Sequence, residues 1–330
     1  MNLNLITNIL KKLIQFVLVM FALSLTVFYM ARLSPGDPLI SYYGEGVERM
    51  SVEEKANAIE KLGLDEPIYA QYIKWLSNAS KGEFGISFKY KQNVSDVISD
   101  VYMNTIILGG FGYVLTFALS LLLGIFCALH EDKFIDKLIC KLGTVTNSIP
   151  SFWISLILIL IFSVNLKILP SSGAYSMGQE NNILNRITHL ILPLTVMILS
   201  HLWYYTYIIR NKLVEEIRED YVLLCKSKGM SSRAIMYKHC LRNIMPSYIS
   251  TMAISIPHII GGTYIVEKVF SYPGLGSLSF ESAKYHDYNM LLVLCLITGA
   301  LVIIGNMIAQ VVSNKIDPRM KYDRGDVGGA

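Results

Sequence analysis

Six long apolar stretches without a charged residue limit what this chain can fold into more than any other feature. Each stretch lacks Asp, Glu, Lys and Arg and is long enough to cross roughly 30 Å of hydrocarbon as a helix that rises about 1.5 Å per residue. They cover residues 13–31, 103–129, 142–166, 187–209, 243–266 and 288–314. The sequence therefore predicts an all-α membrane protein with about six transmembrane helices.

Composition agrees with a chain that lies in a bilayer. Of its 330 residues, 53% are hydrophobic and only 16% are charged, so the apolar content exceeds what one water-soluble core of this length needs. The net charge is +4, but the basic residues are interleaved with Asp and Glu between the apolar stretches. Membrane lipid is therefore the predicted environment, and a nucleic-acid partner is not predicted.

The first apolar stretch could be a signal peptide or a retained helix. Lys11 and Lys12 precede it, as in a signal peptide, but the run is long, Arg32 and Pro35 follow it, and no small-x-small cleavage site stands out. We expect a retained transmembrane helix.

Lysine and arginine in the connecting loops predict the orientation. Seventeen lie in the tails and loops of one side, whereas the short loops of the other side carry four. The long first loop adds eight to that other side, but loops of its length translocate largely regardless of charge. Because short basic loops stay in the cytoplasm, both termini are predicted to be cytoplasmic.

The cysteines give no sign of a disulfide framework or a metal site. All five lie in predicted spans or cytoplasmic loops, and none form a C-x-x-C pair: Cys127, Cys140, Cys225, Cys240 and Cys295. We expect small buried side chains without a structural disulfide and no metal site.

The first loop, residues 32–102, is the only soluble segment large enough to fold as a small unit. Ser51 to Glu54 fits a capping box, which predicts a helix to about Leu62 that ends at Gly63. Pro67 suits the first turn of a second helix that runs to about Ser80. Tyr69, Ile73 and Leu76 would share one face of this second helix. The loop is therefore predicted to form a helical external cap between the N-terminal part, 1–31, and a five-helix core, 103–314; a cytoplasmic tail, 315–330, follows.

Three prolines interrupt the predicted spans. Pro150, Pro193 and Pro257 each remove an intrahelical hydrogen bond. The freed carbonyls need partners in hydrocarbon, so such kinks tend to face other helices or a water-filled path. A plain packing kink is the alternative at each position.

The cytoplasmic loop 210–242 contains the clearest local motif. Ile217, Tyr221, Leu224 and Lys228 recur at helical spacing, so a first short helix could press an apolar stripe on a neighbour. Gly229 would join it to a second helix because glycine tolerates a left-handed turn, and Ser231 can cap that helix. A partner in the cytoplasm is implied.

Here the chain resembles the inner-membrane permeases of the peptide, opine and nickel class of ABC importers. In that family this loop is a coupling helix that sits in a groove of the ATPase subunit, and Gly229 matches its invariant glycine. The name-giving Glu-Ala-Ala positions read Leu223-Leu224-Cys225 here, a departure from the consensus. By this resemblance the coupling residues are Tyr221, Leu224, Cys225, Lys228, Gly229 and Ser231.

Further motifs extend the resemblance over nearly the whole chain. They are Gly36-Asp-Pro38, Leu62-Gly-Leu-Asp-Glu-Pro-Ile-Tyr-Ala-Gln-Tyr72, Phe84-Gly-Ile-Ser-Phe88, Asn104-Thr105, Ile149-Pro-Ser-Phe-Trp153, Leu169-Pro-Ser-Ser-Gly173, Gly261-Gly-Thr-Tyr-Ile-Val-Glu-Lys-Val-Phe-Ser-Tyr-Pro-Gly-Leu-Gly276 and Asp317-Pro-Arg319. The resemblance implies a multi-pass subunit of the bacterial inner membrane with four kinds of partner. These are a second related permease in a heterodimer, two ATPase subunits that hold ATP and magnesium, an extracytoplasmic substrate-binding protein, and the membrane lipid around the spans. The first-loop phrases and the run with Glu267 are slightly more similar to nickel-type than to peptide-type members, so the implied solute is nickel, carried as a chelate, or a short peptide.

Polar groups inside the spans are the candidates for the transport pathway. His201 and His258 could line a metal or proton path, and so could His189, although a histidine bonded to a backbone carbonyl is the commoner case. Glu267 could meet a cationic solute or stabilise the turn that follows it. The complete candidate set is Asn104, Pro150, His201, Pro257, His258 and Glu267.

No pattern for catalysis is visible. The chain has no phosphate-binding G-x-x-x-x-G-K-S/T loop, so nucleotide chemistry is assigned to another chain, and this one is predicted to be no enzyme and to hold no cofactor of its own. A secondary transporter is the alternative function, but it would usually show an internal repeat and paired charges at mid-membrane. An intramembrane enzyme would need a polar catalytic set inside the spans.

Overall fold

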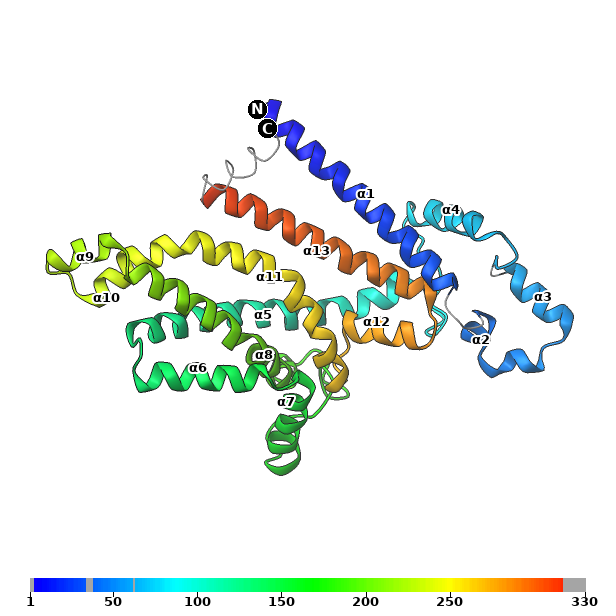
Figure 1. Cartoon of the computed structure of the whole chain (residues 1–330). Helices are drawn as coiled ribbons and strands as arrows, with labels where there is room; N and C mark the ends of the chain where they lie inside the picture. Colours follow the sequence, from blue (N-terminus) through cyan, green and yellow to red (C-terminus); the bar gives the residue numbers. More distant parts are fainter. Residues whose placement is uncertain (1–2, 34–37, 62, 317–330) are drawn as a thin grey trace. The chain divides into compact units, whose positions relative to one another are not determined.

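The computed structural model describes residues 3–33, 38–61 and 63–316 (Figure 1). Within these ranges the regular structure is helical, apart from one isolated bridge between Ile86 and Asn93. The all-α prediction is therefore confirmed. Gly36, Asp37, Leu62 and the motif Asp317 to Arg319, which the sequence analysis singled out, lie outside the described ranges.

The helices follow one another along the chain as Figure 1 labels them. Their bounds are α1 Leu3–Leu33, α2 Pro38–Tyr43, the 3₁₀ helix η1 Gly44–Arg49, α3 Val52–Lys61, α4 Ile68–Ala79, α5 Val94–Leu129, α6 Phe134–Asn147, α7 Ser151–Leu158, the π-helix η2 Ile159–Asn165, α8 Ile183–Ile217, α9 Asp220–Ser227, α10 Ser232–Ile235, the π-helix η3 Met236–Cys240, α11 Leu241–Val269, α12 Leu275–Lys284 and α13 Tyr288–Ile316.

Four described helices are long and apolar enough to cross a membrane by themselves. They are Leu10–Leu33, Val94–Leu129, Ile183–Ile217 and Tyr288–Ile308. Two bent pairs bring the number to six when each pair counts as one span, namely Phe134–Thr146 with Ser151–Asn165 and Ser232–Ile256 with Gly261–Val269. The predicted number of about six spans agrees with this pattern.

The third span differs from a single kinked helix over 142–166. α6 and the α7 segment meet at 100°, and Pro150 is the residue that caps α7. A proline has no N–H to donate and disfavours helical geometry at the residue before it, so the chain leaves the helix at Ser148 and starts again at Ser151. A bend of 56° lies between Ile256 and Gly261, where Pro257 stands. Pro193, in contrast, lies inside the continuous helix α8.

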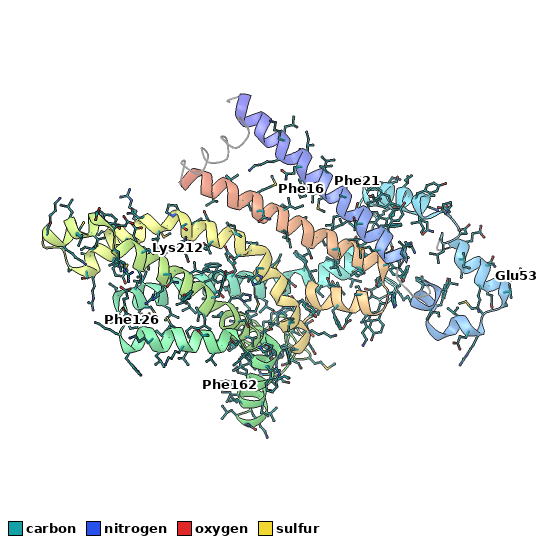
Figure 2. All side chains as sticks on the ribbon, in the orientation of Figure 1. Phe16, Phe21, Glu53, Phe126, Phe162 and Lys212 are labelled. Atoms are coloured by element: carbon teal, nitrogen blue, oxygen red, sulfur yellow. The ribbon has the colours of Figure 1, made fainter. Side chains whose placement is uncertain are left out.

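The described part of the chain divides into two compact units: its residues up to 103 with 274–303, and residues 104–273 with 304–316. In the first unit, α1, α4 and α13 pack around Phe28, Tyr72 and Leu292, which are almost fully buried. The rings of Phe28 and Tyr72 meet edge to face at 5.3 Å, and the Tyr72 hydroxyl lies 2.8 Å from the Ser24 hydroxyl. Figure 2 shows the side chains along these helices.

The predicted helices of the first loop are present as α3 and α4. The Ser51 N–H donates to Glu54 Oε2 at 2.7 Å and the Glu54 N–H to Ser51 Oγ at 3.2 Å, which is the predicted capping box. These bonds from Ser51 hold the pKa of Glu54 below its usual value. On α4 the buried residue is Tyr72, whereas the predicted apolar face of Tyr69, Ile73 and Leu76 is exposed.

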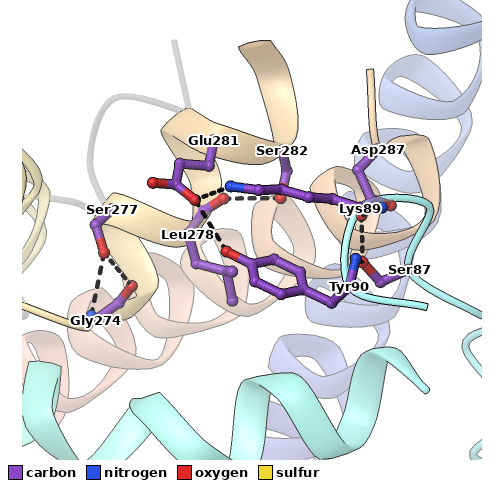
Figure 3. Close-up of polar contacts among 9 residues, drawn as sticks. All are labelled: Ser87, Lys89, Tyr90, Gly274, Ser277, Leu278, Glu281, Ser282 and Asp287. Carbon is purple, nitrogen blue, oxygen red and sulfur yellow. Dashed lines mark hydrogen bonds and ion pairs between the residues drawn. The ribbon is translucent and has the colours of Figure 1, made fainter. Parts of the chain in front are cut away.

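A polar cluster ties residues 87–90 to α12 and to the start of α13 (Figure 3). Lys89 forms an ion pair with Glu281, to which the Tyr90 hydroxyl also donates at 2.9 Å. Ser87 donates to Asp287, which is fully buried and accepts the Lys89 N–H at 3.2 Å. Burial and the bond to Glu281 raise the pKa of Tyr90. Residues about 200 positions apart are thus joined within the first unit.

In the second unit α8 is the central helix, since α6, α7 and α11 all pack against it. The rings of Phe117 of α5 and Tyr205 of α8 lie 4.5 Å apart in the core with a tilt of 41°, and the Tyr248 hydroxyl donates to the Phe117 carbonyl at 3.0 Å. At Gly124 a Cβ would lie 2.7 Å from Ile209 Cγ2, so only glycine permits this approach of α5 and α8. This packing fixes the walls of the candidate site.

A buried ion pair that the sequence analysis did not foresee joins α6 to α8. The Arg210 guanidinium donates to both carboxylate oxygens of Asp136, at 3.1 Å from Nε and 2.6 Å from Nη2. The Asp132 N–H adds a third bond at 3.1 Å, and the Asp136 side chain is only 2% exposed. Such a bidentate contact fixes the angle between two helices as well as their separation.

Candidate functional site

The predicted pair of short helices around Gly229 is present as α9 and α10. Val222 of α9, Ile235 of α10 and Met236 are almost fully buried and pack into the core of the second unit. The segment is therefore anchored by its own apolar side chains on one side. Together with η3, it connects the end of α8 to the start of α11.

Gly229 forms the turn between the two helices with φ of +77°. Its N–H donates to the Lys226 carbonyl at 2.9 Å, and the Met230 N–H donates to the Cys225 carbonyl at 3.2 Å. This is the bond pattern of a helix that ends on a left-handed residue, where glycine is favoured. Ser231 then caps α10 through an acceptor bond from the Ala234 N–H at 3.3 Å. Both local predictions are confirmed.

The six predicted coupling residues fall into two groups. Tyr221 and Cys225 are half-buried against the core, while Leu224, Lys228, Gly229 and Ser231 are exposed. The Tyr221 hydroxyl donates to Glu216 Oε1 at 2.7 Å and lies 3.5 Å from Cys240 Sγ. Burial and these two contacts raise the pKa of Tyr221. Tyr221 thus ties α9 to the ends of α8 and η3.

The exposed apolar surface of the segment differs from the predicted stripe. Ile217 ends α8, and the chain turns at Arg218 before α9 begins, so Ile217 and Leu224 do not share a continuous helix. Leu223 and Leu224 are instead exposed side by side, at 61% and 55%, and Tyr237 is exposed at 56%. Leu223 is not among the six predicted coupling residues, although two adjacent exposed leucines in a basic loop are a signal for a partner surface.

A groove between α8 and α11 brings two of the predicted pathway residues together. Its volume is about 610 Å³, within the range of roughly 300–1,000 Å³ that is typical of small-solute sites. The rings of His201 and His258 meet edge to face at 5.4 Å. Its lining consists of Ser200, His201, Tyr204, Tyr205, Ile208, Thr251, Ile254, Ser255 and His258.

The two imidazoles give the groove its specific chemistry. His201 Nδ1 lies 2.9 Å from the Met197 carbonyl, which places a proton on Nδ1 and leaves Nε2 as an acceptor. The remaining polar groups are hydroxyls, so the lining carries no formal charge unless an imidazole is protonated. Such a groove suits a neutral or zwitterionic solute with hydrogen-bond donors. In the part of the chain that the structure describes, no group of three His, Cys, Asp or Glu is placed to hold a metal ion.

The other predicted pathway residues lie away from this groove. The Asn104 amide donates to the Pro273 carbonyl at 2.9 Å, and the fully buried Glu267 accepts a bond from the Thr105 hydroxyl at 2.9 Å. The Glu267 carbonyl also accepts the Tyr272 N–H at 2.8 Å. Asn104 and Glu267 therefore hold the turn that follows α11.

The other candidate residues lie at a helix start, at a helix bend or in a loop contact, where they support the fold. Pro150 caps α7, and Pro257 stands in the bend of α11. His189 bonds to the Ser172 carbonyl at 2.9 Å and to the Ser176 hydroxyl at 3.1 Å. His189 thus follows the common pattern that the sequence analysis named as its alternative.

Known protein families match the chain along most of its length. The profile described as binding-protein-dependent transport system inner membrane component covers residues 120–322, and the N-terminal profile of the same system covers residues 5–109. One relative, the oligopeptide transport system permease protein AppB of Bacillus subtilis, is 33% identical over 95% of this chain and 99% of its own. The metal-staphylopine import system permease protein CntB of Staphylococcus aureus is 32% identical over 95% of this chain and 97% of its own.

A solved structure shares the fold. A membrane chain of the MetNI methionine ABC transporter, in an inward-facing conformation, aligns with 66% of this chain and 96% of its own length at a TM-score of 0.50 and 14% identity. Both relatives align over nearly their entire lengths, so the shared family accounts for the whole architecture and not for one motif. This chain belongs to the binding-protein-dependent inner membrane components, the multi-pass permease subunits of ABC importers.

Proposed function

We propose that this permease forms half of an import pathway for a small amino-acid-derived solute, either a short peptide or a metal chelate. The relatives named above serve oligopeptides and metal-staphylopine, which supports this class. The groove with His201 and His258 supplies imidazoles and hydroxyls that can bind the amide and amino groups of such a solute. A second, related permease would complete the pathway as a heterodimer.

One observation carries the proposed mechanism. α8 and α11 line the groove, and the α9–α10 segment, together with η3, connects the same two helices. At a rise of about 1.5 Å per residue, the groove lies about 25 Å along each helix from the segment. A push on the segment therefore reaches both walls of the groove through two rigid helices.

The energy would enter through partner subunits. Two ATPase subunits that bind ATP and magnesium would contact the exposed Leu223 and Leu224 and close on nucleotide. A substrate-binding protein would deliver the solute to the opposite side, where the first loop lies in the proposed orientation. Alternating access then follows from the change in angle between α8 and α11.

Uptake in a deletion strain tests the groove. The strain is complemented with the wild-type gene and supplied with a radiolabelled short peptide or with a radiolabelled nickel chelate. We expect uptake of one of the two, and a reduction of about tenfold or more for His201→Ala with His258→Ala, because both imidazoles leave the groove. His130→Ala, at the end of α5 outside the groove, is the matched control and should transport normally. Wild-type uptake in the double variant would exclude the groove as the pathway.

A further inference from the structure

The first unit contains a cavity that none of the assignments above uses. Its volume is about 380 Å³, and it lies between the C-terminal turn of α1, the inner face of α4, residues 83–88 and the start of α13. Arg32, Gln71, Trp75 and Asn289 are among its lining residues. All of them belong to the same compact unit.

Three of the lining residues each carry a buried polar atom that has no hydrogen-bond partner within the described part of the chain. They are Arg32 Nη1, Gln71 Oε1 and Trp75 Nε1, and they make up half of the six such atoms in that part. Buried donors and acceptors are almost always satisfied in folded proteins, so three in one cavity point to a ligand that satisfies them.

The surrounding contacts hold these groups in place. The Arg32 guanidinium lies over the rings of Phe28 at 5.4 Å and Tyr288 at 5.9 Å. The Gln71 Nε2 donates to the Glu66 carbonyl at 2.8 Å, which leaves its buried Oε1 as a free acceptor at the wall of the cavity. Trp75 stacks on Tyr72 with an angle of 22° between the rings. Gln71 and Trp75 are four residues apart on α4 and share one face.

The atoms define the chemistry of the ligand. Arg32 and Trp75 offer N–H donors, which suit a carboxylate, while Gln71 offers an acceptor for a neighbouring N–H. A carboxylate with an N–H on the adjacent carbon is the main-chain end of an amino acid or a peptide. A phosphate or sulfate would meet both donors but would leave Gln71 without its donor.

The charges at the cavity favour the same conclusion. Glu60, Glu66 and Glu83 line it together with Arg32 and Lys74, so the lining carries one more negative than positive charge. Lys74 pairs with Glu66 at 3.3 Å. A ligand that is only anionic is repelled by this lining, whereas a zwitterion places its carboxylate at Arg32 and its ammonium near the glutamates.

We propose that this cavity is a binding site for the α-amino carboxylate end of a small solute, with Arg32, Trp75 and Gln71 as its recognition groups. The inference rests on the proposed function, since it assigns to the transported solute a site on the side where the binding protein would release it. The site consists of residues other than those of the α8–α11 groove. A solute would meet it before it enters the span region.

Binding to the purified importer complex tests the site. The complex is reconstituted in phosphatidylcholine nanodiscs and titrated by calorimetry with L-alanyl-L-alanine and with its C-terminal amide. In parallel, tryptophan fluorescence is measured in a Trp153→Phe and Trp203→Phe background and again with Trp75→Phe added, because the chain has three tryptophans and the complex holds other subunits. The difference between the two measurements is the emission of Trp75. We expect the dipeptide to bind and to change the Trp75 emission, and the amide to bind at least tenfold more weakly because Arg32 has lost its carboxylate.

Two variants examine the recognition groups. Arg32→Gln should weaken dipeptide binding at least tenfold, and Trp75→Phe, which keeps an aromatic ring but loses the indole N–H, should weaken it several-fold by calorimetry. Arg49→Gln, an exposed arginine of the same loop that does not line the cavity, should bind as the wild type does. Normal subunit ratios in each purified complex show that the variants have assembled.

Three outcomes would overturn the site. They are equal binding of the dipeptide and its amide, wild-type binding in both variants, and no binding by the wild type at millimolar dipeptide. Nanodiscs that contain phosphatidylserine test whether a lipid occupies the site, because the headgroup of this lipid also carries an α-amino carboxylate. If phosphatidylserine changes the Trp75 emission and the dipeptide does not, the site is a lipid site and the proposal fails. Failure of the proposed function is distinct, because it appears as absent uptake while binding at Trp75 remains measurable.

Discussion

At the scale of single residues, Gly229 combines a left-handed backbone with open space around it. Its φ is +77°, and no atom lies within 4 Å of the position that a Cβ would take. A substitution there is therefore strained through the backbone alone. Asp136 is the opposite case, because its backbone is ordinary and its carboxylate is almost fully enclosed by Arg210.

We expect Gly229→Val to uncouple ATP hydrolysis from transport. A branched side chain resists the left-handed turn by about 1–2 kcal/mol, which disturbs the α9–α10 segment without unfolding the spans. In proteoliposomes, stimulation of the ATPase by loaded binding protein and solute uptake should fall together. Gly229→Asn is the control, since asparagine tolerates this backbone and should retain most activity. Full stimulation in the valine variant would show that this turn does not transmit the signal.

We expect Asp136→Asn to destabilise the permease by about 3–5 kcal/mol, because it leaves the Arg210 guanidinium in place without its charged partner. A lower midpoint of thermal unfolding in detergent measures the effect. The control is Glu131→Gln, whose partner Arg218 is 70% exposed and whose loss should cost less than about 1 kcal/mol. Equal midpoints for the two variants would contradict a structural role of the buried pair.

At the scale of elements, α9 is too short to bury all of its apolar side chains. It has only eight residues, so its inner side is fixed by Val222 and Tyr221, and the adjacent Leu223 and Leu224 remain outside. In the proposed mechanism these two exposed leucines, which precede the turn at Gly229, are the apolar contact for the ATPase partner. The basic residues around them keep the rest of the segment in water.

We expect Leu223→Ser with Leu224→Ser to weaken the contact with the ATPase subunits. Two exposed leucines that become buried in an interface contribute about 1.5–3 kcal/mol each, so their loss should reduce co-purification of the ATPase strongly. The amount of permease in the membrane should not change, because neither side chain packs in the core of its own unit. Leu76→Ser, which alters an exposed leucine of α4, serves as the control. Undiminished co-purification of the double variant would place the ATPase contact elsewhere.

At the scale of the whole molecule, the six-span reading and the charge distribution together predict which loops face the cytoplasm. The seventeen basic residues of one side and the four in short loops of the other place the first loop outside and the Gly229 segment inside. The family and the membrane location are established by the comparisons, while the orientation remains a prediction. Two exposed serines offer positions to test it.

We expect a cysteine at Ser77 to react with an impermeant maleimide in intact cells and a cysteine at Ser232 to react only after the cells are opened. Both side chains are exposed, so accessibility within the protein does not limit the reaction. The five native cysteines are replaced by alanine to remove background labelling. Labelling at Ser232 but not at Ser77 in intact cells would reverse the proposed orientation.

The features that the sequence determined by itself have local physical causes. The apolar stretches identify the spans because hydrocarbon burial acts on each segment separately. The bonds between Ser51 and Glu54, and the turns at Gly63 and Gly229, follow from neighbours within a few residues. These features were predicted because no distant part of the chain is needed to form them.

Only the tertiary structure decided which side chains meet across the fold. The pairing of His201 with His258, the ion pair of Asp136 with Arg210 and the cavity around Arg32 each bring together segments that are distant along the chain. The size of the bend at Pro150 likewise depends on how α6 and α7 pack against α8. Such contacts are set by the packing of whole helices, and spacing along the sequence carries no measure of that packing.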